Sequence, residues 1–198
     1  MRVIPKTVVL LSLVAATLTL GLIAAEPPQA GQPGAQEKGA ELKMSIRATA
    51  PESTDSLRFH VTFENLSDKD TVLNLGMMLA NGKVHLPTAV RLILTDPDGQ
   101  SRELFFSDTR VAGRVDDYAV PLRAGSAYTL RLRLKDYWCP KSNEFRLALK
   151  PGIYGVRAEF TGNRAQFVNS DTKGLGSMHF WTGKLESDAA QFQIGKQG

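Results

Sequence analysis

Apolar and polar residues alternate with a period of two along much of this chain. The alternation occurs over residues 57–64, 128–135, 145–150 and 154–160. Successive side chains of a β-strand point to opposite faces, so each segment is expected to place one face on a core and the other in water. Beyond the N-terminal 25 residues, no stretch shows a comparable helical period. The pattern predicts an all-β protein built from antiparallel sheets.

Short apolar runs bounded by turn residues predict further strands. These runs span residues 42–50, 71–75, 88–95, 101–106, 178–183 and 190–194. Between two of them, Asp96-Pro97-Asp98-Gly99 predicts a tight hairpin, because proline presets φ and glycine accepts a positive φ. About 8–10 short strands with turns at this spacing predict an immunoglobulin-like antiparallel β-sandwich.

Two single residues are given structural roles. Tyr154 follows a Pro-Gly turn at the start of a late strand. In immunoglobulin-like sandwiches a tyrosine there bonds back to the preceding corner, although a plain core aromatic is the alternative. Cys139 is the only cysteine, so it has no partner for a disulfide within the chain. It is expected to be a buried apolar residue, with an intermolecular disulfide or a reactive thiol as alternatives.

The N-terminal segment predicts export. Arg2 and Lys6 precede the uncharged apolar run Val8–Ala25, which ends in small residues. This layout predicts a signal-peptide helix over residues 1–25, cleaved after Ala25, and a secreted or periplasmic protein. The run of about 18 residues is near the lower limit for spanning a bilayer, so an uncleaved membrane anchor is the alternative.

The rest of the chain divides into a linker and one domain. Residues 26–39 are mainly Pro, Gly, Gln and Ala with no large apolar side chain, which predicts a disordered, flexible linker. Residues 40–198 have a normal length for a single domain.

Charge and motif content argue against several functions. The net charge of +4 is interspersed along the chain, which disfavours nucleic-acid binding. His60, His85 and His179 lie far apart, whereas a zinc site needs three or four convergent ligands. In Gly174–Met178 the serine falls one place late for a nucleophile elbow. The sequence therefore predicts a non-enzymatic protein with no cofactor or metal.

Three loops supply the candidate binding residues. The longest irregular stretch is 161–177, and loops of that length are usually functional or mobile. Its predicted contacts combine an apolar anchor with polar groups, namely Arg164, Gln166, Phe167 and Asn169. The loop 137–144 adds Tyr137 and Trp138, which are expected either to stack on a ligand or to pack in the core. The third predicted loop, 107–119, is rich in charged residues.

A basic stripe is also predicted on one strand. Arg131, Arg133 and Lys135 point to its polar side. A solvated face is the simpler interpretation, and an anionic glycan or cell-surface polymer is the alternative.

The C-terminal part resembles a known group of proteins. Trp181-Thr182-Gly183-Lys184-Leu185-Glu186-Ser187-Asp188 fits a W-x-G-x-[IL]-x-S-[ND] stretch before a final strand. It resembles uncharacterised secreted bacterial proteins with an immunoglobulin-like β-sandwich, in which Trp181 has a structural role. The segment 63–70 is similar to these proteins and to bacterial proteinase-inhibitor-like sandwiches. The resemblance implies a fold and a compartment, and no activity.

Three functional hypotheses remain open at this stage. The first is an exported, non-catalytic binding or interaction module that uses loops at one end of the sandwich, with an unknown protein or glycan partner. The second is a proteinase-inhibitor-like sandwich that presents a loop to a protease. The third is an enzyme with an unrecognised site. A membrane enters only if the N-terminal segment stays uncleaved.

Overall fold

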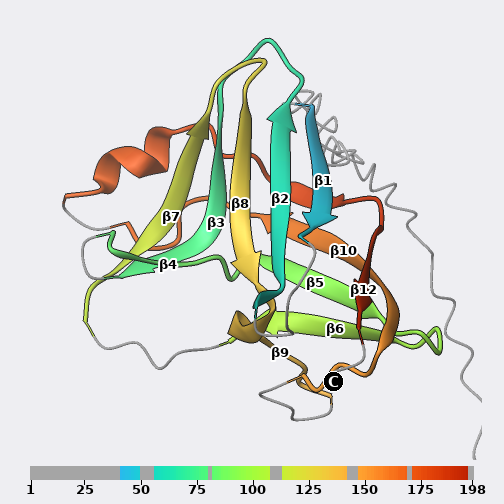
Figure 1. The fold of residues 1–198 in the computed structure, drawn as a ribbon. Coiled ribbons are helices and arrows are strands. Elements are labelled where there is room, and N and C mark those ends of the chain that lie inside the picture. The colour runs from blue at the N-terminus through green and yellow to red at the C-terminus, as the bar shows by residue number, and fades with distance from the viewer. Residues whose placement is uncertain are drawn as a thin grey trace, which may run out of the picture. The chain divides into compact units, whose positions relative to one another are not determined.

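A computed structural model of the chain describes residues 41–49, 56–79, 82–107, 113–141, 147–168 and 171–195. The signal peptide and linker predicted over residues 1–39 lie outside these residues, as does Asn169. The regular structure of the described part is mostly antiparallel β-strand with almost no helix, which confirms the all-β prediction (Figure 1). Two short 3-10 helices occur, Leu134–Asp136 and Lys173–Ser177. The strands are β1 (Leu42–Ala48), β2 (Arg58–Asn65), β3 (Thr71–Leu79), β4 (Val84–Leu86), β5 (Val90–Thr95), β6 (Ser101–Phe106), β7 (Val115–Leu122), β8 (Ala127–Arg133), β9 (Tyr137–Trp138), β10 (Gly152–Gly162), β11 (Gly183–Glu186) and β12 (Ala190–Ile194).

The described strands form three sheets. One has the order β1-β2-β8, and a second has the order β4-β3-β7. The third has the order β11-β10-β5-β6-β9, with β12 also paired to β10. Every ladder between named strands is antiparallel, as the alternating pattern predicts.

The core lies between the β1-β2-β8 sheet and the sheet that contains β10. Phe63 of β2 meets Phe160 of β10 with ring centroids 5.1 Å apart, and Phe59 meets Phe192 of β12 at 5.8 Å. Phe59, Val61 and Phe63 are fully buried, which is the apolar half of the predicted alternation. Each such side chain contributes about 1.5–3 kcal/mol through burial.

The hairpin predicted at Asp96–Gly99 is present between β5 and β6. The Gly99 N–H donates to the Asp96 carbonyl at 2.9 Å, and Gly99 has φ of 79°. The Asp96 carboxylate accepts the N–H groups of Asp98 and Gln100 at 3.0 and 2.8 Å. The turn therefore forms for the reason that the sequence indicates.

The motif around Trp181 has a packing explanation. The Trp181 ring stacks on Phe160 at a centroid distance of 5.6 Å. A Cβ on Gly162 would lie 2.4 Å from the Trp181 ring, so only glycine fits beneath it. Ser187 occupies the interruption between β11 and β12, where its hydroxyl accepts the Ala158 N–H at 2.9 Å. Trp181 before β11, Gly183 at its start and Ser187 after it thus belong to the segment that places the short strands β11 and β12 along β10.

The other two residues with predicted structural roles are also buried. The Tyr154 hydroxyl donates to the Lys150 carbonyl at 3.0 Å, which is the backward bond expected of it, and its ring stacks on Phe192 at 5.4 Å. Cys139 is only 2% exposed and forms no disulfide.

Three strand assignments differ from the sequence prediction. Residues 178–183 were expected to form a strand, but only an isolated bridge at Phe180 occurs before β11 begins at Gly183. Residues 107–119 were expected to form a loop, but Val115–Leu122 is β7, the longer of the two strands that pair with β3. The residues at and just before its start, Arg114-Val115-Asp116-Asp117, are mostly charged. Asp117 is nevertheless buried, where its carboxylate accepts a hydrogen bond, so the usual alternation of a strand is hidden. A strand was also expected over 145–150, but residues 147–150 are not in a strand. Leu147 and Leu149 still pack on the core, which explains their alternation without a ladder.

Candidate binding cleft

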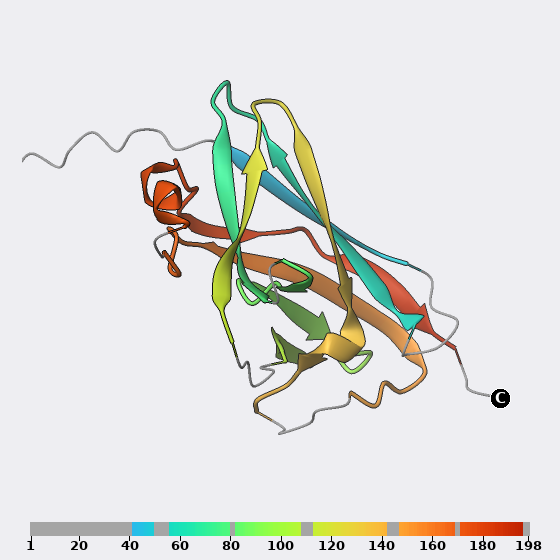
Figure 2. The same cartoon turned by 90° about the vertical axis from the view of Figure 1, so that its left-hand side faces the viewer.

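Strands β7 and β8 are neighbours in the chain but do not pair. Among the described strands, β7 pairs only with β3, and β8 pairs only with β2. The two strands are close at the turn 123–126 that joins them and diverge away from it, as both views show (Figures 1 and 2). Each therefore presents one unpaired edge to the space between them.

The register of β8 shows which of its backbone groups are unpaired. Leu134 donates its N–H to the Leu57 carbonyl at 3.2 Å, and Asn65 donates to Ser126 at 2.9 Å. Even-numbered residues of β8 therefore bond to β2, because hydrogen-bonded and non-hydrogen-bonded pairs alternate in an antiparallel ladder. The N–H and C=O groups of Thr129 and Arg131 point to the other edge, where no described residue bonds to them.

The edge of β7 is different because of Pro121. Val72 of β3 directs its N–H and C=O to His179 and Trp181, so it makes no ladder bonds to Pro121 opposite. The ring nitrogen of Pro121 therefore lies on the outer edge of β7, where a proline removes no ladder bond.

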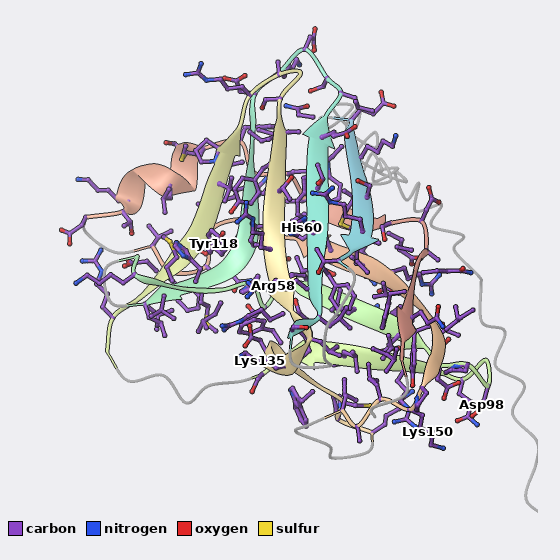
Figure 3. The ribbon with its side chains drawn as sticks, viewed as in Figure 1. Arg58, His60, Asp98, Tyr118, Lys135 and Lys150 are labelled. Carbon is purple, nitrogen blue, oxygen red and sulfur yellow. The ribbon has the colours of Figure 1, made fainter. Side chains whose placement is uncertain are left out.

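A cleft of about 770 Å³ opens along the unpaired edge of β8, and it is named the edge cleft here. One wall is β8 and the following turn, and the other is formed by Tyr118 of β7 and residues 84–87 in and after β4. Figure 3 shows Tyr118 on one side, and Arg58 and Lys135 on the other. The residues that line it are Arg58, Val84, His85, Leu86, Pro87, Phe106, Ser107, Tyr118, Tyr128, Thr129, Leu130, Arg131, Leu132, Arg133, Lys135 and Asp136.

The charged groups of the edge cleft are mainly cationic. Among the described residues that line it, Arg58, Arg131, Arg133 and Lys135 are accompanied by a single carboxylate, Asp136. Arg133 donates to Asp136 at 2.7 Å, so that carboxylate is already engaged. Neither Arg58 nor Arg131 forms an ion pair with a described residue. Their positive charge is available to a ligand.

Basic side chains face each other across the outer side of the β1-β2-β8 sheet. Arg58 is directly opposite Arg133, and His60 is opposite both Arg47 and Arg131. The two pairs with β8 are of the non-hydrogen-bonded kind, in which side chains are closest. Like charges in that position destabilise a sheet. These five residues are named the basic face.

The positive charges of the basic face affect the pKa of His60. Its Nδ1 accepts the Arg47 Nε–H at 3.1 Å. The pKa of His60 is lowered from its ordinary 6.5, first by burial and then by the charges of Arg47, Arg131 and Arg58. The face therefore resists a further positive charge, as expected where cations lack compensating carboxylates.

Aromatic residues form the inner part of the edge cleft. The hydroxyls of Tyr118 and Tyr128 are 2.6 Å apart, and the His85 ring lies 4.6 Å from that of Tyr118. Burial, followed by the hydrogen bond to Tyr128, raises the pKa of Tyr118. Tyr118 is therefore neutral at physiological pH, and its hydroxyl meets that of Tyr128 in the lining of the cleft.

The loop predicted to bind, 161–177, is held to the sheet by a buried aspartate. Asp117 is 1% exposed, and its carboxylate accepts the N–H groups of Gln166 and Phe167 at 2.8–3.0 Å. The side chain of Asn74 donates to Asp117 at 2.8 Å and to the Arg164 carbonyl at 3.1 Å. Three of the predicted binding residues thus come together through their backbones.

The side chains of that loop have different surroundings. Arg164 and Gln166 are exposed, and Phe167 is half-buried. Arg164 lines a second hollow of about 540 Å³ with Ala165 and residues 175–182. The sequence thus anticipated residues that lie together, but it did not anticipate their anchor, Asp117, which fell in a predicted loop.

The remaining predicted contacts are divided between core and surface. Tyr137 is 1% exposed and donates its hydroxyl to the Val90 carbonyl at 3.2 Å, so its ring is not accessible to a ligand. Trp138 is half-buried and pairs with Phe105 in the β6-β9 ladder. Neither residue lines the edge cleft.

Across the described ranges, no cluster of three or more His, Cys, Asp or Glu side chains could hold a metal ion. None of the helices in the described part is long and apolar enough to cross a membrane. No known family model matches the chain, and no curated protein matches it.

Proposed function

We propose that this chain is an exported, non-catalytic binding module with an immunoglobulin-like β-sandwich fold, and that it binds an anionic partner in the edge cleft. The site differs from the end loop that the sequence favoured. In the cleft, cationic side chains, unpaired backbone groups and aromatic rings lie around one hollow.

The observation that carries the proposal is the placement of Arg58 and Arg131. Both are exposed and both line the cleft; Arg58 faces the cation Arg133 across the sheet, and Arg131 faces the imidazole of His60. This arrangement costs stability in the free protein. A bound anion offsets that repulsion and gains charge-assisted hydrogen bonds from the guanidinium groups.

The loop 161–177 supports the proposal less strongly. Its backbone polar groups at 164, 166 and 167 are already used by Asn74 and Asp117. The hollow beside it contains one arginine and no comparable group of cations.

The test measures binding of two polyanions to the full chain, poly-L-glutamate and a heparin oligosaccharide, by isothermal titration calorimetry at low salt. The double variant Arg58→Glu/Arg131→Glu is expected to bind the tighter polyanion at least about tenfold more weakly, and added salt is expected to weaken the wild type.

A matched control separates this site from the overall charge. Arg123→Glu/Lys184→Glu makes the same change in net charge at two exposed residues outside the cleft. It is expected to change the affinity by less than about twofold. Equal losses in the two double variants, or no binding of either polyanion by the wild type, would overturn the proposal.

A further inference from the structure

We propose that the edge cleft binds an extended acidic peptide segment, which adds to the outer edge of β8 as a further strand. This inference rests on the proposed function and names the chemical class of the partner. Three features of β8 support it independently: its free backbone groups, the two different faces it offers, and its length.

The backbone groups of β8 are suited to pair with a strand. Thr129 and Arg131 direct their N–H and C=O groups into the cleft, where no described residue bonds to them. An extended peptide satisfies such an edge through main-chain hydrogen bonds, whereas a polysaccharide has no matching repeat of donors and acceptors. Exposed edges are usually protected by proline, lysine or a covering loop. Pro121 is placed to protect the edge of β7, but the edge of β8 has no proline.

The faces of β8 determine the side chains of the partner. An added strand continues the pleat, so its outward side chains lie beside Arg131 and Arg133. Its inward side chains lie toward Leu130 and Leu132, with Tyr118 and Leu86 across the cleft. The favoured partner therefore alternates acidic and apolar residues. Charge complementarity on one side and apolar contacts on the other select for this pattern.

The length of the edge limits the size of the contact. Residues 129–133 span about 16 Å at ~3.3 Å per residue. A peptide of about seven residues covers this distance with one residue beyond each end.

The experiment uses the full chain and a blocked, fluorescently labelled peptide of alternating glutamate and valine, about seven residues long, with binding followed by anisotropy. Thr129→Pro removes one outward N–H and leaves the β2 ladder intact, because the Thr129 backbone does not bond to β2. Thr129→Val is the matched control, since it also loses the hydroxyl contact to Thr62 but keeps the N–H. We expect Thr129→Pro to weaken peptide binding at least tenfold, and Thr129→Val to change it less than twofold.

A second measurement needs no protein variant. Two versions of the peptide are made. In one, the backbone nitrogens of all glutamates are methylated, and in the other, those of all valines are. Only one set of nitrogens faces β8 in an added strand, so one methylated peptide is expected to lose binding and the other to keep it. Antiparallel addition makes the glutamate nitrogens the sensitive set.

The remaining outcomes separate this inference from the proposed function. If the peptide binds and needs Arg58 and Arg131, but tolerates Thr129→Pro and both methylation patterns, strand addition is overturned while the anionic site stands. If only the heparin oligosaccharide binds in an arginine-dependent way, the partner is a glycan and the peptide inference fails alone. If neither anion binds, both fail. A dimer of the chain that excludes the peptide also overturns the inference, because a second copy then occupies the edge.

Discussion

The side-chain amide of Asn74 lies 2.8 Å from a carboxylate oxygen of Asp117, and both residues are at least 96% buried. Asn74 precedes the register shift in β3, and Asp117 is opposite Met77 on the other side of that shift. The same carboxylate accepts the N–H groups of Gln166 and Phe167. One buried pair therefore connects two strands to the long loop that follows β10.

Replacing Asp117 with Asn should destabilise both the strand pair and the loop. The new amide replaces one of the two acceptor oxygens with an NH2 donor, so at least one of the buried donors of Asn74, Gln166 and Phe167 loses its acceptor. The expected cost is about 2–3 kcal/mol, measured by urea unfolding. Hydrogen exchange at residues 166 and 167 should accelerate beyond the global effect.

Asp188→Asn is the control for that change. Asp188 is exposed, and the replacement removes the same charge without a buried partner. It is expected to shift stability by less than about 0.5 kcal/mol. Similar costs for both variants would show that Asp117 does not anchor the loop.

Gly162→Ala should test the packing of Trp181. The added Cβ would lie 2.4 Å from the ring, so Trp181 has to move away from Phe160. Such overpacking typically costs about 1–3 kcal/mol. Gly174→Ala, at a site with no atom within 4 Å, is expected to be nearly neutral in the same thermal denaturation. A neutral Gly162→Ala would contradict the close packing of this motif.

Anion binding at the basic face should be coupled to the protonation of His60. In the free protein Arg47, Arg58 and Arg131 help to hold the pKa of His60 below 6.5. A bound anion offsets their charge and raises that pKa, so binding takes up a proton. By linkage, affinity for a heparin oligosaccharide, whose sulfates do not titrate, should increase as pH falls from about 8 to 5.5.

NMR titration of the His60 ring, with and without the oligosaccharide, measures this shift directly. His60→Gln should remove most of the pH dependence and leave binding at pH 8 nearly unchanged. A His60 pKa that stays the same in the complex would place the anion away from the basic face.

The all-β class and the positions of many strands followed from the sequence because the alternating segments are amphipathic. The β2 alternation and the Asp96–Gly99 turn each carry a local physical signal, and both occur as expected. β7 was missed because its first residues are charged and its buried Asp117 has partners that lie 49 or 50 residues away in the chain. No local pattern reveals such a contact.

The edge cleft was only partly visible in the sequence. The stripe of Arg131, Arg133 and Lys135 was recognised, but Arg58 comes from another strand and aligns with Arg133 only through the β2-β8 register. The unpaired edge depends on which strands pair, and sequence patterns do not specify that. Residues from β4, β6 and β7 complete the cleft, so it is a product of the tertiary structure.

The buried tyrosines should make the protein sensitive to alkali. Burial is the main cause that raises the pKa values of Tyr118, Tyr137 and Tyr154 above the ordinary 10.0. The folded protein then keeps protons that the unfolded chain releases, so the free energy of unfolding is intact below pH ~10 and falls as pH rises further. Urea unfolding at several pH values between about 8 and 11.5 measures this slope.

Tyr137→Phe should cost about 1 kcal/mol at pH 8 by losing the bond to Val90, yet it should make the decline above pH 10 shallower. Absorbance at 295 nm should show these tyrosines ionising together with unfolding. Ionisation well before unfolding would mean that the rings are accessible to hydroxide in the folded protein.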